Sequence, residues 1–206
     1  LLKDGSISLK GWQKLSLDRA HIEFRGSEVD IVSMRFRHDT DHRGKFEISG
    51  TFSPYLSDRP SSLAVELETY PVAGIAGPDL GKLFSGRIDT ESSAKSNYLT
   101  VLPAPDPQAN LTVSFKNSLA DPLEVSGFPF LIGIAQILDD DWFERPIFEA
   151  NATGIIRRAG GNIAIGDLNL ETRDRIAIRG TLAQTSNRSL AGKLEVGLAE
   201  AMIKSS

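Results

Sequence analysis

GSEVDIVSMRFRHDTDHRGKFEISGTF (26–52) and GGNIAIGDLNLETRDRIAIRGTL (160–182) repeat one another, and this repeat decides the fold. The matching apolar positions in the first part of each stretch lie 134 residues apart: Val29 and Ile163, Ile31 and Ile165, Met34 and Leu168, Phe36 and Leu170. Those in the second part lie 130 residues apart: Phe46 and Ile176, Ile48 and Ile178, Gly50 and Gly180, Phe52 and Leu182. SSLAVELE (61–68) then matches RSLAGKLE (188–195). We therefore predict two similar units, with one copy over residues 26–68 and the other over 160–195.

Apolar and polar residues alternate along both copies, which is typical of strands with one buried and one solvated face. Both copies also change parity at one place. The buried positions are odd-numbered through Ile31 and Ile165, and even-numbered from Met34 and Leu168. A β-bulge or a tight turn at the same place in each copy would produce this change.

The predicted fold class is mainly β: one or more long, twisted antiparallel sheets built from two similar β-units, with a short helix packed on the apolar face. Further strands are expected at 86–92, 98–102, 111–115, 123–126 and 148–156. The proline-rich LPAPDPQ (102–108) cannot pair as a central strand and is either a loop or a boundary. We therefore divide the chain into an N-terminal β-unit (1–102) and a C-terminal β-unit (103–206).

GFPFLIGIAQILDDDWF (127–143) is the one stretch with helical spacing, and we expect a helix at about 128–138. Acidic residues at a helix C-terminus oppose the helix dipole, so the helix should end near Leu138, before Asp139–Asp141. We expect it to lie across the apolar face of a sheet. The alternative is an element that contacts a membrane or a ligand.

Composition excludes several classes of function. The 206 residues carry a formal net charge of -4, and lysine and arginine are scattered, so we expect no nucleic-acid partner. The chain has no cysteine, which excludes disulfides, thiolate nucleophiles and cysteine-ligated metals. The opening LLKDGSISLKG (1–11) lacks the pattern of a signal peptide, and we expect the chain to be a segment of a longer protein.

HDTDHRGK (38–45) is the nearest approach to a metal site, because His38 and His42 flank two aspartates. The corresponding connection in the second copy, ETRDR (171–175), has no histidine and lies where four residues are lost between the copies. We therefore interpret HDTDH as a hairpin tip of variable length.

Other chemical motifs fail on spacing. GPDLGKLF (77–84) lacks the first glycine and the Ser or Thr of a Walker A loop. Asp139–Asp141 with Glu144 match neither a calcium loop nor a glycosidase pair, and we expect a solvated helix end. Trp12 and Trp142 could stack on sugars, although large aromatics are more often core. We assign no catalytic, cofactor-binding or metal-binding residue, and we predict that the chain is not an enzyme and uses no cofactor.

The run FEANATGIIRRAGGNIAIGDLNLETRDRIAIRGTLAQTSNRSLAGKLEV (148–196) resembles the C-terminal domain of AsmA-like proteins, through a glycine-marked turn, a strand ending in a "dL.L" pattern and a strand ending in glycine. VSGFPFLIGIAQILDDDWFERPIF (125–148) resembles the short helix that precedes this unit in the family. ISGTFSP (48–54) and the segment 63–89 are similar to the glycine rhythm of the same AsmA and TamB superfamily.

The resemblance implies a periplasmic protein of the bacterial cell envelope, anchored in the inner membrane by a segment absent from this chain. It also implies a part in lipid transport or outer-membrane assembly, through an apolar-faced β-groove that binds phospholipid or another envelope lipid. The candidate groove residues lie on the repeated apolar faces and on the helix: Phe46, Ile48, Phe52, Ile176, Ile178, Leu182, Phe130, Leu131 and Ile134. Two alternatives stay open: a scaffold that pairs with envelope proteins through exposed strand edges, and a carbohydrate-binding domain.

Overall fold

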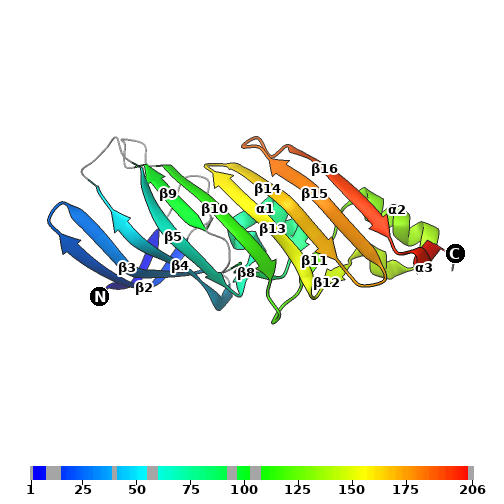
Figure 1. Ribbon diagram of the computed structural model, residues 1–206, viewed down its shortest axis with the longest axis horizontal. Coiled ribbons are helices and arrows are strands. Elements are labelled where there is room, and N and C mark those ends of the chain that lie inside the picture. Colours follow the sequence, from blue (N-terminus) through cyan, green and yellow to red (C-terminus); the bar gives the residue numbers. More distant parts are fainter. Residues whose placement is uncertain are drawn as a thin grey trace.

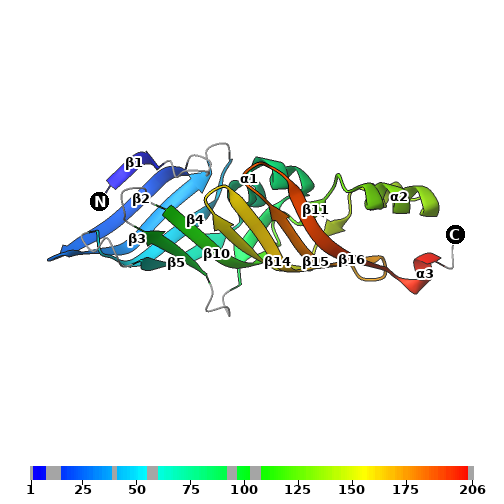
Figure 2. The same cartoon turned by 90° about the horizontal axis from the view of Figure 1, so that it is seen from above.

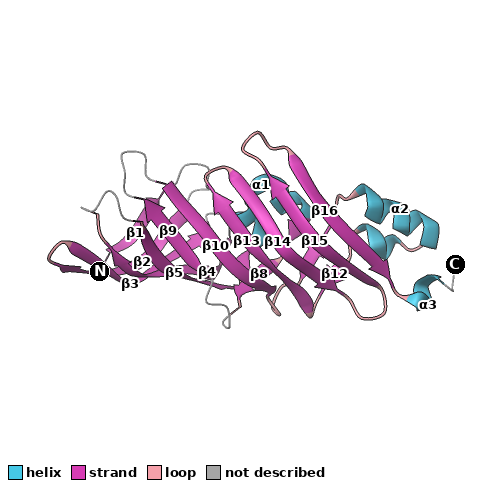
Figure 3. Cartoon of the chain, turned by 45° about the horizontal axis from the view of Figure 1, so that its top comes forward, coloured by secondary structure: helices cyan, strands magenta, loops and turns pink. Residues whose placement is uncertain are grey.

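The computed structural model describes residues 2–7, 15–38, 41–54, 60–91, 97–102 and 108–203, and most of them lie in strands (Figure 3). The first half of the chain contains β1 (Leu2–Ile7), β2 (Leu15–Arg25), β3 (Glu28–His38), β4 (Asp41–Phe52), β5 (Ser61–Glu68), β6 (Tyr70–Pro71), α1 (Val72–Leu83), β7 (Phe84–Ser85), β8 (Arg87–Thr90) and β9 (Tyr98–Leu102). The second half contains β10 (Gln108–Asn117), β11 (Leu123–Val125), α2 (Pro129–Leu138), the 3₁₀ helix η1 (Asp141–Glu144), β12 (Ile147–Phe148), β13 (Asn151–Ala159), β14 (Asn162–Glu171), β15 (Ile176–Gln184), β16 (Leu190–Leu198) and α3 (Glu200–Ile203).

A single long antiparallel sheet runs the length of the molecule (Figure 1). Its strands follow the order β1-β2-β3-β4-β5-β9-β10-β13-β14-β15-β16, while β8 pairs with both β6 and β10 beside this path. A small second sheet contains β12, β11 and β7. The predicted fold class, mainly β with a long antiparallel sheet and a short helix, is confirmed.

The sheet has one apolar and one polar face, as the alternation predicts. In β5, Leu63, Val65 and Leu67 are buried, whereas Ala64 and Glu66 between them are exposed. The apolar face is concave, because the N-terminal strands turn upward until β1 lies on the same side of the sheet as α1 and α2 (Figure 2). The sheet therefore forms a trough, and the apolar core occupies its inside.

Both predicted irregularities are β-bulges. The register between β3 and β4 shifts between Ile31 and Met34, and the register between β14 and β15 shifts between Ile165 and Leu168. A bulge places two residues opposite one, so the side chains after it change parity and stay on the same face. The two copies of the repeat therefore share an irregularity of backbone structure as well as a residue pattern.

The two bulged strands, β3 and β14, pair with β4 and β15, and the two pairings do not have the same register when the copies are aligned by sequence. Gly50 lies opposite Ile31, before the first bulge, whereas Gly180 lies opposite Leu168, after the second. This difference is two residues along the strand. Because side chains in a strand repeat every two residues, the displacement leaves the apolar residues on the concave face.

Helix α2 begins at Pro129 and ends at Leu138, in agreement with the predicted helix at about 128–138. Asp139 ends it in the left-handed conformation, and the Asp140 carboxylate then accepts a hydrogen bond from the Trp142 N–H at the start of η1. These acidic residues terminate one helix and cap the next.

Helix α1 was not predicted, because its sequence, VAGIAGPDLGKL, contains three glycines and a proline. Its backbone is broken at Gly77, with φ 76° and ψ 174°, so it consists of two short helical segments. The buried Arg158 of β13 donates a hydrogen bond of 2.6 Å to the Ile75 carbonyl next to this break. A side chain distant in sequence thus satisfies a backbone group that a continuous helix would have satisfied itself.

Hydrogen-bonded pairing continues across the predicted boundary between units 1–102 and 103–206. Leu102 of β9 pairs with Gln108 of β10, and β10 pairs on its other side with β13. Most of the LPAPDPQ segment itself lies outside the described residues. The strands of the two predicted units therefore belong to one sheet.

Candidate functional site

An apolar groove lies on the concave face at the N-terminal end of the sheet. It encloses a volume of about 370 Å³ and is open to one side. Its thirteen lining residues are all apolar: Leu15, Ile22, Val29, Ile31, Met34, Phe36, Phe46, Ile48, Phe52, Pro54, Leu63, Leu99 and Val101. We call this feature the apolar groove.

Strands β2, β3, β4, β5 and β9 form the groove because the sheet curls most strongly here (Figure 2). β2 has register shifts against β3 between Leu17 and Arg19 and again between His21 and Ile22. β3 has two more against β4, one at the bulge after Ile31 and one between Phe36 and His38. Each bulge increases the local twist and bends the strand. Four irregularities close together therefore curve the apolar face around a central hollow.

The groove has a buried floor and accessible walls. Phe36 and Phe46 are 2% and 1% exposed and form part of its floor. Ile22 and Val29, near the hairpin between β2 and β3, are only half-buried. Phe24 lies directly opposite Val29 at this hairpin and is 80% exposed. A row of apolar side chains thus leads from the interior to the outer end of the groove.

Helix α1 and Tyr70 lie beside the inner end of the groove. The Tyr70 ring contacts the Phe46 ring edge-on, with centroids 5.9 Å apart, and contacts the His38 ring at 6.4 Å. Gly74 of α1 fits against both of these rings: a Cβ there would lie 2.7 Å from Tyr70 Cε1 and 2.9 Å from His38 Cδ2. The close contact between helix and rings blocks this end, so the groove is confined to the N-terminal part of the trough.

Tyr70 is fully buried, and its burial raises the pKa of the phenol well above the ordinary value. Its hydroxyl oxygen has no hydrogen-bond partner within the described part of the chain. Because the neutral phenol is strongly favoured, Tyr70 contributes an uncharged, mostly apolar surface.

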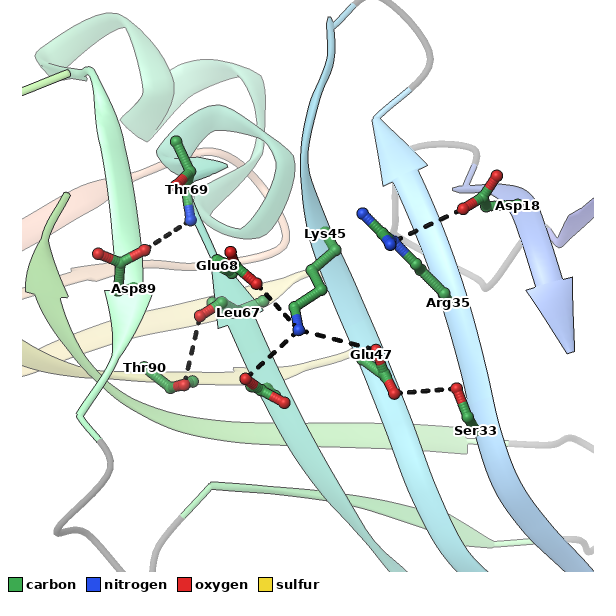
Figure 4. Close-up of polar contacts among 11 residues, drawn as sticks. Asp18, Ser33, Arg35, Lys45, Glu47, Leu67, Glu68, Thr69, Asp89 and Thr90 are labelled. Carbon is green, nitrogen blue, oxygen red and sulfur yellow. Dashed lines mark hydrogen bonds and ion pairs between the residues drawn. The ribbon is translucent and has the colours of Figure 1, made fainter. Parts of the chain in front are cut away.

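The opposite, convex face of the same strands is charged (Figure 4). Lys45 alternates with the groove residue Phe46 along β4, and its Nζ donates a hydrogen bond of 2.9 Å to Glu68 Oε2. Glu66 and Glu47 lie 3.5 Å and 3.9 Å from the same nitrogen. The hydrogen bond to Glu68 is the main cause that raises the pKa of Lys45, and it also lowers the pKa of Glu68. The two faces of β4 therefore differ sharply: the convex face is ionic and the concave face is hydrocarbon.

The nine predicted groove residues fall into three groups. Phe46, Ile48 and Phe52 line the groove. Ile176, Ile178 and Leu182 lie on the equivalent face of β15, where they are buried in the core. The helix residues Phe130, Leu131 and Ile134 lie on α2 and pack against this core. The structure therefore brings only the residues of the first copy together around an open hollow.

Sequence reasoning missed the groove residues contributed by β2 and β9. Leu99 and Val101 alternate within a predicted strand, and Leu99 pairs with Leu63 of β5. That pairing joins strands that are separated in sequence by β6, α1, β7 and β8. The alternation of Leu99 and Val101 predicts that they share one face of their strand. It does not predict that this strand pairs with β5, and that non-local pairing places them at the groove.

The histidine-containing loop is a hairpin, as predicted. His38 of β3 pairs with Asp41 of β4, and the two residues between them lie outside the described residues. The described residues contain no group of three or more metal-ligating side chains.

The described residues of the other motifs make contacts within the chain. Trp142 stacks under Arg175, whose Cζ lies 4.6 Å from the ring centroid, and packs edge-on against Phe143. Arg175 also pairs with Asp140 at 3.1 Å, so these groups fasten η1 to the turn between β14 and β15. Trp12 lies outside the described residues. The GPDLGKLF segment lies mostly within α1, where Lys82 is exposed and pairs with Asp79.

Comparisons with protein-family models, with curated proteins and with solved structures found no match to this chain. The resemblance to AsmA-like proteins therefore stays a prediction. Among the described helices, none has the length and apolar character needed to span a bilayer.

Proposed function

We propose that the chain is a non-enzymatic lipid-binding module whose apolar groove holds an acyl chain, and that it acts in lipid transport or assembly in the bacterial cell envelope. The observation that carries this proposal is the composition of the groove: all of its lining residues are apolar, although the groove is open. Sites for sugars, nucleotides or peptides contain convergent polar groups that orient the ligand. A hydrocarbon chain needs none.

The energetics favour such a ligand. Each methylene group that leaves water for an apolar surface gains about 0.8 kcal/mol. An acyl chain of ordinary length gains several times this amount in the groove, and the groove walls lose their own contact with water at the same time. The exposed Phe24 extends the apolar surface to the outer end, where a chain would enter.

The envelope location and the inner-membrane anchor rest on the resemblance of residues 148–196 to AsmA-like proteins. An elongated trough with a polar convex face suits this setting, because the outside of the sheet remains solvated while a lipid tail is held inside. We expect the lipid head group to remain outside the groove, in water. Phospholipid is the partner that we propose.

Titration of the purified protein with a fluorescent fatty acid tests the proposal. Val101 lines the groove and Thr100 precedes it on β9, facing the other side of the strand. We expect Val101→Asp to weaken binding at least about tenfold, because it places a charge where the ligand must be desolvated. Thr100→Asp, which adds the same charge on the convex side, should bind like the wild type.

A second variant separates binding from folding. Met34→Trp fills the groove without adding a charge, and Met34 is only half-buried, so the strand should tolerate the larger side chain. Both groove variants should retain the circular dichroism spectrum of the wild type. Absence of fatty-acid binding by the wild type, or equal binding by all variants, would refute an acyl-chain site in the groove. Transfer of a labelled phospholipid between vesicles then tests the transport role.

A further inference from the structure

Strand β16 forms one edge of the long sheet (Figure 1), and some of its apolar side chains are exposed. Its only pairing partner among the described strands is β15. Leu190, Leu194, Val196 and Leu198 lie opposite concave-face positions of β15, yet Leu190 is 49% and Val196 is 38% exposed. A nine-residue edge strand without a bulge or proline offers a row of backbone groups to another strand.

The charges of β16 fit a second copy of the same strand. Lys193 and Glu195 lie on the convex side, are 82% and 73% exposed, and contact each other at 3.3 Å. When two β16 strands pair antiparallel with Leu194 opposite Leu194, each Lys193 lies directly opposite the Glu195 of the other copy. Oppositely charged residues in directly opposed positions stabilise an antiparallel pair.

The same register also matches the apolar face. It places Leu190 opposite Leu198, and Gly192 opposite Val196, so a small residue meets a β-branched one. An edge lysine ordinarily discourages strand pairing. Here the opposing charge is Glu195 of the second copy. Because Lys193 meets Glu195 only when Leu194 lies opposite Leu194, the charged pairs favour this register.

We propose that the chain forms a symmetric homodimer by antiparallel pairing of β16 with β16, centred on Leu194. The two-fold axis is perpendicular to the joined sheet, as an isologous interface requires, and both concave faces lie on the same side. Helix α2 lies on this side and extends past β16 (Figures 1 and 2), so in the dimer it overlies strands of the other copy. Its exposed Ile132 and Ile137 supply apolar surface for that contact.

Variants that reverse the charge of Lys193 or Glu195 test the proposed register of the two β16 strands. Lys193→Glu places glutamate opposite glutamate, and Glu195→Lys places lysine opposite lysine. In sedimentation velocity experiments at low ionic strength, we expect each single variant to raise the dimer dissociation constant about tenfold. Both positions are highly exposed, so both variants should still fold, and circular dichroism checks this. The check matters most for Glu195→Lys, which places a lysine opposite Arg179 of β15 within the same copy. An equimolar mixture of the two single variants should form heterodimers of wild-type affinity, and the double variant should form homodimers again.

Disulfide trapping provides an independent measurement, because these 206 residues contain no cysteine. Directly opposite residues place their Cβ atoms about 5 Å apart, close to disulfide geometry. Leu194→Cys should therefore give a covalent dimer under mild oxidation. Val196→Cys, which faces Gly192 of the other copy, should not.

The proposal is overturned if the wild type stays monomeric over the whole accessible concentration range. It is also overturned if a dimer forms whose affinity neither charge variant changes, or if Val196→Cys crosslinks as fast as Leu194→Cys. Fatty-acid binding by the groove variants is a separate measurement, so the dimer and the acyl-chain site can fail independently.

Discussion

The rings of Phe36 and Phe46 lie directly opposite each other on β3 and β4, with centroids 5.9 Å apart and planes inclined by 43°. The pair forms part of the floor of the apolar groove. A tilted aromatic pair of this kind adds about 0.5–1.5 kcal/mol to the stabilisation from burial alone. The groove therefore has a firmly packed base beneath its accessible walls.

Phe46→Ala tests how far this floor supports the N-terminal part of the sheet. Loss of the buried ring removes its contacts with Phe36 and Tyr70, and we expect the free energy of unfolding to fall by about 3 kcal/mol or more. Urea denaturation measures the change. Phe24→Ala is the matched control, because Phe24 is 80% exposed and its truncation should change stability by less than about 0.5 kcal/mol.

Ile178→Asp tests the orientation of the second copy of the repeat. Ile178 is 1% exposed on β15, so the substitution buries an unpaired carboxylate, and we expect a loss of more than about 3 kcal/mol with poor soluble expression. Thr181→Asp on the same strand is exposed and should be tolerated. Equal thermal stability of the two variants would contradict the assignment of Ile178 to the inner face.

Arg87 fastens the inserted β6–β8 region to the main sheet. Its Nε donates to Asp121 Oδ2, and its Nη1 donates to the carbonyls of Arg43 and Thr69 at 2.7 Å each. One ammonium group cannot reproduce this planar geometry, so Arg87→Lys should cost about 2 kcal/mol or more in thermal or urea unfolding. Arg179→Lys, at an exposed position, is the control and should be nearly silent. Equal stability of both lysine variants would mean that these hydrogen bonds of Arg87 contribute little.

Lys45→Met tests the charged face through the dependence of stability on pH. The pKa of Glu68 is lowered from 4.5 by the hydrogen bond from Lys45, so this contribution is complete above pH 4.5 and is lost as the pH falls through the folded pKa. The pKa of Lys45 is raised from 10.5, so its contribution is lost only when the pH rises above that value.

The wild type should therefore exceed the Lys45→Met variant in stability by a nearly constant amount between these limits. Glu68 is 62% exposed, and screening by solvent limits the difference to about 1 kcal/mol. Urea unfolding at a series of pH values measures it, with Lys116→Met on the same side of the sheet as the control. A difference that persists undiminished in strong acid would mean that Lys45 acts by packing and not by charge.

Much of the fold follows from local sequence. Alternation predicts the strands and their inner faces, and the parity change after Ile31 and Ile165 locates both bulges. The helical spacing of residues 128–138 and the acidic residues that follow predict α2. These features depend on side chains that are neighbours within one strand or helix, so the chain sequence records them directly.

Helix α1 is hidden from this kind of reasoning because its glycines reflect contacts with distant parts of the chain. Gly74 is small because Tyr70 and His38 press against it, and Gly77 adopts a conformation that favours glycine. The low helix propensity of this segment therefore indicates a loop. Its packing against the rest of the protein nevertheless stabilises a broken helix. The groove has the same origin, since its walls combine β2 and β9 with strands that lie far from them in sequence.

By itself, the sequence determined that this protein is a twisted antiparallel sheet with one apolar side, because the period of its residues fixes which side chains share a face. Only the tertiary structure decided where that side is covered. Ile176 and Phe46 occupy matching positions in the two copies of the repeat, yet Ile176 lies in a closed core and Phe46 forms part of the floor of an open groove. Curvature of the sheet and the placement of α1 and α2 separate the two cases, and both depend on contacts between distant residues that no local pattern records.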